Sequence, residues 1–235
     1  MTKKNFLFIA TFVVLGLIAL QVPVTEIVGS RAKFTVYDAF APLAGSFIGS
    51  LPGMMAVFLV QLVNFLVHGA NIEDVGTVIR FFPTLFAVLY FAKKRGVNVV
   101  IPILAVAAFI AHPIGRTVWY FSLFWIIPVA AHFIRDRFLF ARALGATFTA
   151  HAVGGALWIW AFALPAPVWQ SLIPVVMVER LLFALGICGS FVLVNNVLGF
   201  LEKKRVITLA FYLDPKYLIP ALRGERHASA TPSQA

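Results

Sequence analysis

Residues 147–190, TFTAHAVGGALWIWAFALPAPVWQSLIPVVMVERLLFALGICGS, place a histidine and an adjacent acid–base pair inside two long apolar segments. The pattern predicts a helix, a proline-containing loop and a second helix. His151 lies near the middle of the first helix, and Glu179 and Arg180 lie about half-way along the second. A charge at the centre of a bilayer costs at least about 2.5–3.5 kcal/mol, so these groups should face protein or a water-filled cavity. We therefore expect the candidate site here.

The composition indicates an all-α, polytopic membrane protein. The chain has 235 residues, of which 61% are hydrophobic and 12% are charged, and its mean hydropathy is +0.95. The charged residues cluster between apolar runs long enough to cross a bilayer as helices. We expect a multi-pass protein of the cell membrane, with one transmembrane helical domain over residues 1–205. Residues 206–235 should form a cytoplasmic tail that is first amphipathic and then disordered.

Apolar runs divide the chain into eight predicted helical segments. Pro52 and Gly53 are expected to make a turn between the second and third, and Pro174 is expected to break or bend the last. Several runs are near the short limit of a span, so we expect six to eight crossings. The predicted segments cover residues 5–24, 36–51, 54–68, 77–92, 97–112, 117–134, 139–163 and 168–201.

The distribution of basic residues predicts the orientation in the membrane. In the eight-segment scheme eleven basic residues share one side: Lys3, Lys4, Lys93, Lys94, Arg95, Arg135, Arg137, Arg142, Lys203, Lys204 and Arg205. The opposite side has four: Arg31, Lys33, Arg80 and Arg116. Because cytoplasmic loops carry the excess of Lys and Arg, both termini should face the cytoplasm.

Several function classes find no support in the sequence. A net charge of +10 would suggest nucleic-acid binding in a soluble domain, but no basic face studded with aromatic residues occurs here. Cys188 stands alone, and His68, His112 and His151 lack ligands at helical spacing, so we expect no metal site. Ser190 and His151 lack the context of a hydrolase, and no nucleotide-binding loop occurs. We expect neither a cofactor nor an enzyme.

The buried charges allow two interpretations. Glu179 and Arg180 are neighbours and point about 100° apart on a helix, so each should need a partner from another segment. Arg80 or Arg116 could approach Glu179 or a bound anion, and Asp38 could approach Arg180. Three arginines against two acids would make the pocket positive. Either these groups form the polar floor of a solute pocket, or they are a structural pair that fixes helix packing.

An aromatic face accompanies the histidine. His151 and Trp158 are seven residues apart, so they share one face of the predicted helix and could stack on and hydrogen-bond a flat heterocyclic solute. The alternative is a core histidine with its hydrogen bonds satisfied, beside an aromatic belt at the membrane interface. Trp160 and Trp169 fit that belt.

One stretch resembles a known family. The segment YDAFAPLAGSFIGSLPG at residues 37–53, followed by a helix with Gln61 and Asn64, resembles the substrate-binding S components of energy-coupling factor (ECF) transporters. The run FFPTLFAVLYFAKKR that ends at Arg95 looks like the fourth helix of that group. The resemblance covers residues 30–95.

The resemblance implies a helical bundle that captures a vitamin-like micronutrient from outside. A membrane-embedded T subunit and two cytoplasmic ATPases would drive release. Family binding sites lie in the outer half of the bundle. Together with the charge analysis, this gives eight expected substrate-binding residues: Tyr37, Asp38, Arg80, Arg116, His151, Trp158, Glu179 and Arg180. The remaining alternative is a non-catalytic membrane scaffold or morphogenesis-type protein, since fold does not fix function.

Overall fold

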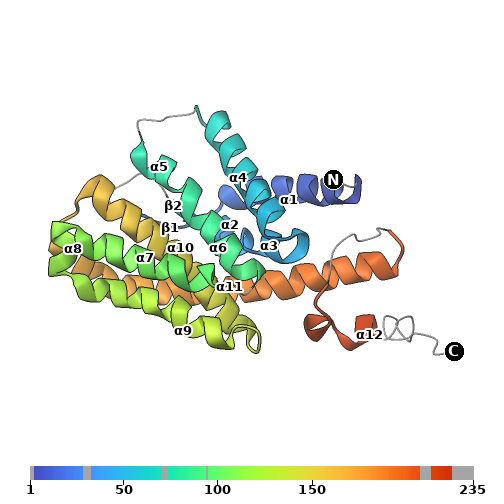
Figure 1. Cartoon of the computed structure of the whole chain (residues 1–235). Helices are drawn as coiled ribbons and strands as arrows, with labels where there is room; N and C mark the ends of the chain where they lie inside the picture. The colour runs from blue at the N-terminus through green and yellow to red at the C-terminus, as the bar shows by residue number, and fades with distance from the viewer. Residues whose placement is uncertain (1–2, 29–32, 70–73, 94, 207–212, 224–235) are drawn as a thin grey trace.

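The computed structural model describes residues 3–28, 33–69, 74–93, 95–206 and 213–223, and these are mostly helical (Figure 1). The long helices are α1 (Lys3–Leu20), α4 (Ser50–Val67), α6 (Phe81–Ala92), α7 (Val97–Ala111), α10 (Leu139–Phe162) and α11 (Ala166–Lys203). Shorter helical pieces are α2 (Val36–Phe40), α3 (Leu43–Ile48), α5 (Val75–Ile79), α8 (Pro113–Thr117), η1 (Trp119–Ile126), α9 (Ile127–Ile134), η2 (Pro215–Tyr217) and α12 (Pro220–Arg223).

The central packing unit is the pair α6 and α10. On one side of it α7, η1 and α9 pack against α10, and on the other side α3 and α4 pack against α6, with α1 packed on α4 and α2. The long helix α11, orange in Figure 1, extends along the molecule and contacts α10 and α2. Gly145 on α10 permits the closest approach, because a Cβ atom there would lie 2.2 Å from the ring of Tyr90 on α6. Small residues thus set the distance between the two central helices.

Within the described residues, three helices are long and apolar enough to cross a membrane: Ser50–Val67, the combined segment Val75–Ala92, and Ala166–Lys203. Four shorter apolar helical segments accompany them, of which the second combines α2 with α3 and the fourth combines η1 with α9: Ile9–Leu20, Val36–Ile48, Val97–Ala111 and Trp119–Ile134. The length and composition of these helices agree with a membrane protein. Residues 213–223 contact the far end of α11, where Asn195 and Asn196 hydrogen-bond the backbone of Asp214, Tyr217 and Ile219.

The predicted loop after the first helix is a β-hairpin instead. Strand β1 (Pro23–Glu26) pairs antiparallel with β2 (Lys33–Thr35), and α1 ends at Leu20 rather than near residue 24. Lys33 and Glu26, opposite each other in the ladder, form an exposed ion pair of 3.3 Å. The hairpin matters because it contributes one wall of the cavity described below.

The predicted segment 36–51 is wrong as a single helix. It divides into α2 and α3, and the next reversal occurs at Gly49, whose φ of +92° favours glycine, rather than at Pro52 and Gly53. Pro52 lies in the first turn of α4, where its missing N–H costs nothing. The expected close packing is present. A Cβ atom at Gly45 would lie 2.6 Å from Val88 O, and a Cβ atom at Gly53 would lie 2.7 Å from the backbone nitrogen of Gly45.

Two later segments also differ from the prediction. The segment expected at 117–134 is a 3₁₀ stretch, η1, followed by α9, which starts at the residue before Pro128. The last helix is not broken, because α11 continues through Pro174 to Lys203. Because α11 is continuous, one helix carries both the buried charges and the end that contacts residues 213–223.

Candidate functional site

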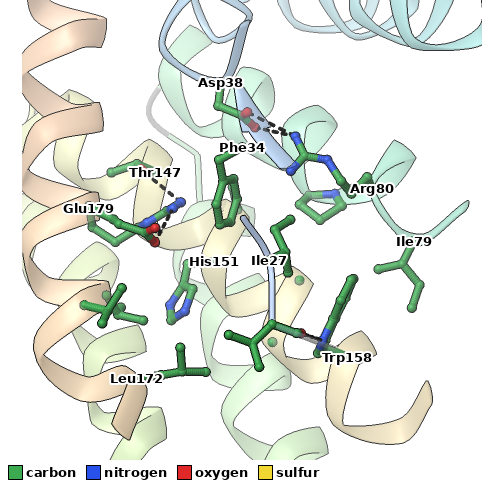
Figure 2. Close-up of a pocket in the computed structure, with 18 of the residues that line it drawn as sticks. Ile27, Phe34, Asp38, Ile79, Arg80, Thr147, His151, Trp158, Leu172 and Glu179 are labelled. Atoms are coloured by element: carbon green, nitrogen blue, oxygen red, sulfur yellow. Dashed lines mark hydrogen bonds and ion pairs between the residues drawn. The ribbon is translucent and has the colours of Figure 1, made fainter. Parts of the chain in front are cut away.

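A cavity of about 230 Å³ lies between α10, α11, η1, the α5–α6 segment and the hairpin. Figure 2 shows that the charged groups gather at one end, where Asp38, Arg80, Thr147 and Glu179 are drawn, while Trp158 and Leu172 lie at the other, with Ile27 and His151 between them. Polar groups grouped within an apolar pocket are typical of small-molecule sites, because they orient the ligand and the apolar surface contributes most of the contact.

Arg80 and Asp38 form a closed pair at the polar end. Arg80 Nη2 donates to both carboxylate oxygens of Asp38, at 3.1 and 3.0 Å. Asp38 is held in place because its Oδ2 accepts the backbone N–H of Thr35 at 2.7 Å, the capping box that starts α2. The carboxylate is therefore satisfied by protein groups.

Arg180 and Glu179 form a looser pair across the cavity. Arg180 is only 2% exposed, and its Nη2 lies 3.4 Å from Glu179 Oε2. Its Nη1 reaches Thr147 Oγ1, also at 3.4 Å, and its Nε has no partner among the described residues. These distances exceed those of a good charge-assisted hydrogen bond, which is about 2.7–2.9 Å. Arg180 is thus a buried cation with incomplete hydrogen bonding.

Phe34 of the hairpin separates the two pairs. The Cζ atoms of Arg80 and Arg180 lie 5.1 and 4.4 Å from the centre of the Phe34 ring. In Figure 2 this ring stands between Arg80 and Glu179. Two cation–π contacts on one ring keep the cations apart and help to compensate for their loss of hydration.

His151 lies on the cavity side of α10, with a fixed ring. Trp125 Nε1 of η1 donates to His151 Nδ1 at 3.0 Å. Because an indole nitrogen can only donate, Nδ1 must be the acceptor, which assigns the hydrogen of the neutral ring to Nε2. No described residue hydrogen-bonds Nε2. Phe121 and Phe148 pack against the ring, with centroids 5.7 and 6.2 Å away.

The apolar end is built by two tryptophans whose indole N–H groups are already used. Trp158 Nε1 donates to Val28 O of the hairpin segment, and Trp169 Nε1 donates to Leu164 O, both at 3.0 Å. Phe121 packs on Trp169 edge to face, with centroids 5.0 Å apart. These rings offer flat, rigid apolar surface without free polar atoms.

The structure brings six of the eight expected residues to this cavity: Asp38, Arg80, His151, Trp158, Glu179 and Arg180. The other two lie elsewhere. Tyr37 is 1% exposed and its hydroxyl donates to Val57 O at 3.1 Å, and Arg116 is exposed near the end of α8. Without Arg116 the buried ionic groups are two arginines and two acids, so the cavity is not positive as expected.

The ion pairs also differ from the expected ones. Asp38 pairs with Arg80 rather than with Arg180, because the capping of α2 points its carboxylate towards α5 and α6. Glu179 contacts its own neighbour Arg180, at the long distance that adjacent helical positions impose.

The sequence analysis missed Phe34, Trp125 and Thr147 as parts of the site. Phe34 reaches the site through the hairpin, whose strands PVTE and KFT are too short to give a clear strand signal. Trp125 lies 26 positions from its partner His151, and no local pattern predicts such a contact. In the described part of the chain, no group of three or more His, Cys, Asp or Glu side chains could hold a metal ion.

A second, more polar cavity of about 320 Å³ adjoins α1, α4 and the hairpin and shares Arg80 with the first. Gln21, Asn64 and His68 line it, and Gln21 Nε2 donates to Asn64 Oδ1 at 3.0 Å. Arg80 therefore stands between the two spaces.

Comparisons of this chain with protein-family models, with curated proteins and with solved structures returned no match.

Proposed function

We propose that this chain is a membrane-embedded substrate-binding subunit of an uptake system, which captures a small aromatic or anionic solute from the outer side. The observation that carries the proposal is the cavity itself. Its polar groups are concentrated at one end, in a protein whose long helices are apolar enough for a bilayer. Buried ionisable groups inside a membrane protein most often serve a ligand or ion.

The proposal includes an ECF-type arrangement. The chain would cross the membrane six to eight times with both termini in the cytoplasm, following the excess of basic residues on one side. A membrane T subunit and cytoplasmic ATPases would supply the energy, since the sequence has no nucleotide-binding loop of its own. Support for this part comes from the resemblance of residues 30–95 to S components.

A non-catalytic scaffold is the second candidate. The contact of Arg80 Nη2 with both carboxylate oxygens of Asp38 favours it, because this pair could serve only to hold α2 against the α5–α6 segment. In that case the cavity would be a packing defect with no ligand of its own.

Ligand-dependent thermal stability distinguishes the two. The detergent-purified protein is heated with vitamins, nucleobases, amino acids and divalent metals, each in turn. A cognate ligand at 100 times its Kd should raise the unfolding free energy by about 2.7 kcal/mol. A folded protein that responds to none of these compounds would favour the scaffold.

Variants of the loose pair sharpen the test. Glu179→Gln and Arg180→Ala should abolish the ligand-induced shift and leave most of the protein folded, whereas Arg116→Gln, an exposed arginine away from the cavity, should retain the shift. If the single variants do not fold, the double variant E179Q/R180Q removes both charges together and leaves neither uncompensated. A double variant that folds and still responds to the ligand would contradict a role for this pair in binding.

A further inference from the structure

We propose that the cavity binds a neutral, planar heteroaromatic solute whose hydrogen-bond acceptor receives the Nε2–H of His151. This inference rests on the proposed function and narrows it, because it selects a neutral ligand over an anionic one.

In the part of the chain that the structure describes, the buried hydrogen-bonding atoms that lack a partner at the polar end are donors. Two buried nitrogens of cavity residues, Arg80 Nη1 and Arg180 Nε, have no partner among the described residues. The carboxylate of Asp38, in contrast, already accepts from Arg80 and Thr35. No oxygen of a described cavity side chain is buried without a partner. A complementary ligand therefore presents acceptors, such as carbonyl oxygens or ring nitrogens.

His151 is the donor best placed to contact a ligand. The contact with Trp125 occupies Nδ1 and leaves the hydrogen on Nε2. His151 is half-buried while it lines the cavity, and in Figure 2 its ring lies between the Glu179 pair and Leu172. A donor at a fixed position beside aromatic rings selects the orientation of a flat ligand rather than merely its size.

The charge balance argues against a charged ligand. The two guanidinium groups face two carboxylates, Asp38 and Glu179, so the buried ionic groups sum to zero. An added anion would lie near the carboxylate of Glu179, and an added cation would lie near Arg180. In either case a further charge would lose its hydration without an unpaired charge of opposite sign to receive it. A neutral ligand with acceptors avoids both costs.

The shape of the cavity favours a planar ligand. Trp158, Trp169 and Phe121 line the space opposite the charges. The indole N–H groups of the two tryptophans already donate to backbone carbonyls of the protein. Flat apolar walls gain most from an aromatic ligand, which buries area on both faces.

The experiment compares three planar quinoline probes of similar size: the neutral quinoline-3-carboxamide, the anionic quinoline-3-carboxylate and the cationic 1-methylquinolinium-3-carboxamide. Their affinities for the full chain in detergent are measured by thermal shift and by tryptophan fluorescence. The neutral probe should bind at least about tenfold more tightly than either charged one. Binding of a charged probe with equal or greater affinity would overturn the inference and leave the proposed function standing.

Two substitutions at His151 test the donor itself. In His151→Gln the amide nitrogen can take the place of Nε2, whereas in His151→Asn the shorter amide reaches only the place of Nδ1. Affinity for the neutral probe should fall about tenfold in the Asn variant and recover in the Gln variant. Equal affinity in both folded variants would contradict the role of Nε2. If no quinoline probe and no member of the broader panel binds the folded wild-type protein, the proposed function fails together with this inference.

Discussion

Trp125 Nε1 donates a hydrogen bond of 3.0 Å to His151 Nδ1, and this contact joins η1 to the middle of α10 beside the cavity. Trp125 has no exposed surface, and His151 is half-buried on the cavity side of α10. The contact therefore both stabilises the fold and orients the candidate site.

Replacement of Trp125 by Phe should lower the free energy of unfolding by about 1–3 kcal/mol, because a buried Nδ1 loses its donor and part of a ring is removed. Thermal denaturation of the ligand-free protein measures this. Trp119→Phe is the matched control, since Trp119 is 52% exposed and should change stability by less than about 0.5 kcal/mol. An equal effect in the two variants would contradict the importance of the buried contact.

Gly145 should be among the least replaceable residues of α10. In Gly145→Ala the new Cβ would overlap the ring of Tyr90, which is fully buried and anchored through its hydroxyl to Pro128 O at 2.7 Å. We expect a loss of about 1–3 kcal/mol of unfolding free energy, or failure to fold.

Gly189→Ala provides the comparison for the glycine prediction. No neighbouring atom lies within 4 Å of a Cβ at Gly189, so the alanine should be neutral or should stabilise α11 by up to about 1 kcal/mol. If both alanine variants were equally stable, the close approach of α6 and α10 would be wrong.

Two arginines cap the carbonyl end of α6. Arg135 donates to the carbonyls of Tyr90, Phe91 and Lys93, and Arg142 donates to those of Phe91 and Ala92. The last carbonyls of a helix have no partner within it, so these donors replace water.

Arg135→Met should therefore cost roughly 2–3 kcal/mol of unfolding free energy, since it leaves buried carbonyls without donors. Arg137→Met, at an exposed neighbour, should change the melting temperature little. A melting temperature that falls equally in both variants would show that the capping contacts contribute nothing specific.

Single-cysteine labelling tests the orientation. In a Cys188→Ala background, the variants Lys93→Cys and Lys204→Cys should resist a membrane-impermeant maleimide in intact cells, and Arg116→Cys should react. Labelling of the first two sites from outside would reverse the proposed topology.

Hydropathy predicted the long helices well because burial in a bilayer or in a core demands continuous apolar sequence. The predicted segments 139–163 and 168–201 correspond to α10 and α11 within a few residues. The hairpin was missed because each strand has only three or four residues, too few to establish an alternating pattern. The break occurs at Gly49, which has a positive φ. The turn was predicted at Pro52 and Gly53 instead, because proline followed by glycine is a stronger turn signal in the sequence than an isolated glycine.

The candidate site was predicted by residue type more than by pairing. Charged residues within apolar segments identified Asp38, Arg80, Glu179 and Arg180, since such groups must be buried from lipid. Their partners depended on tertiary geometry: the capping of α2 aims Asp38 towards Arg80, and this could not be read from local sequence. Arg116 was included because it could approach Glu179 or a bound anion, but it lies exposed near the end of α8 and does not line the cavity.

The most direct test of the central claim is equilibrium binding of the best panel ligand to wild-type protein and to Ala150→Phe. Ala150 lines the cavity, so a phenyl group there should occupy the ligand's space; Ala161→Phe, exposed on the same helix, is the control. We predict that Ala150→Phe remains folded and loses binding by at least about a hundredfold, while the control binds like wild type. Unchanged affinity in a folded Ala150→Phe protein would show that the ligand binds elsewhere, and the account of this cavity would be wrong.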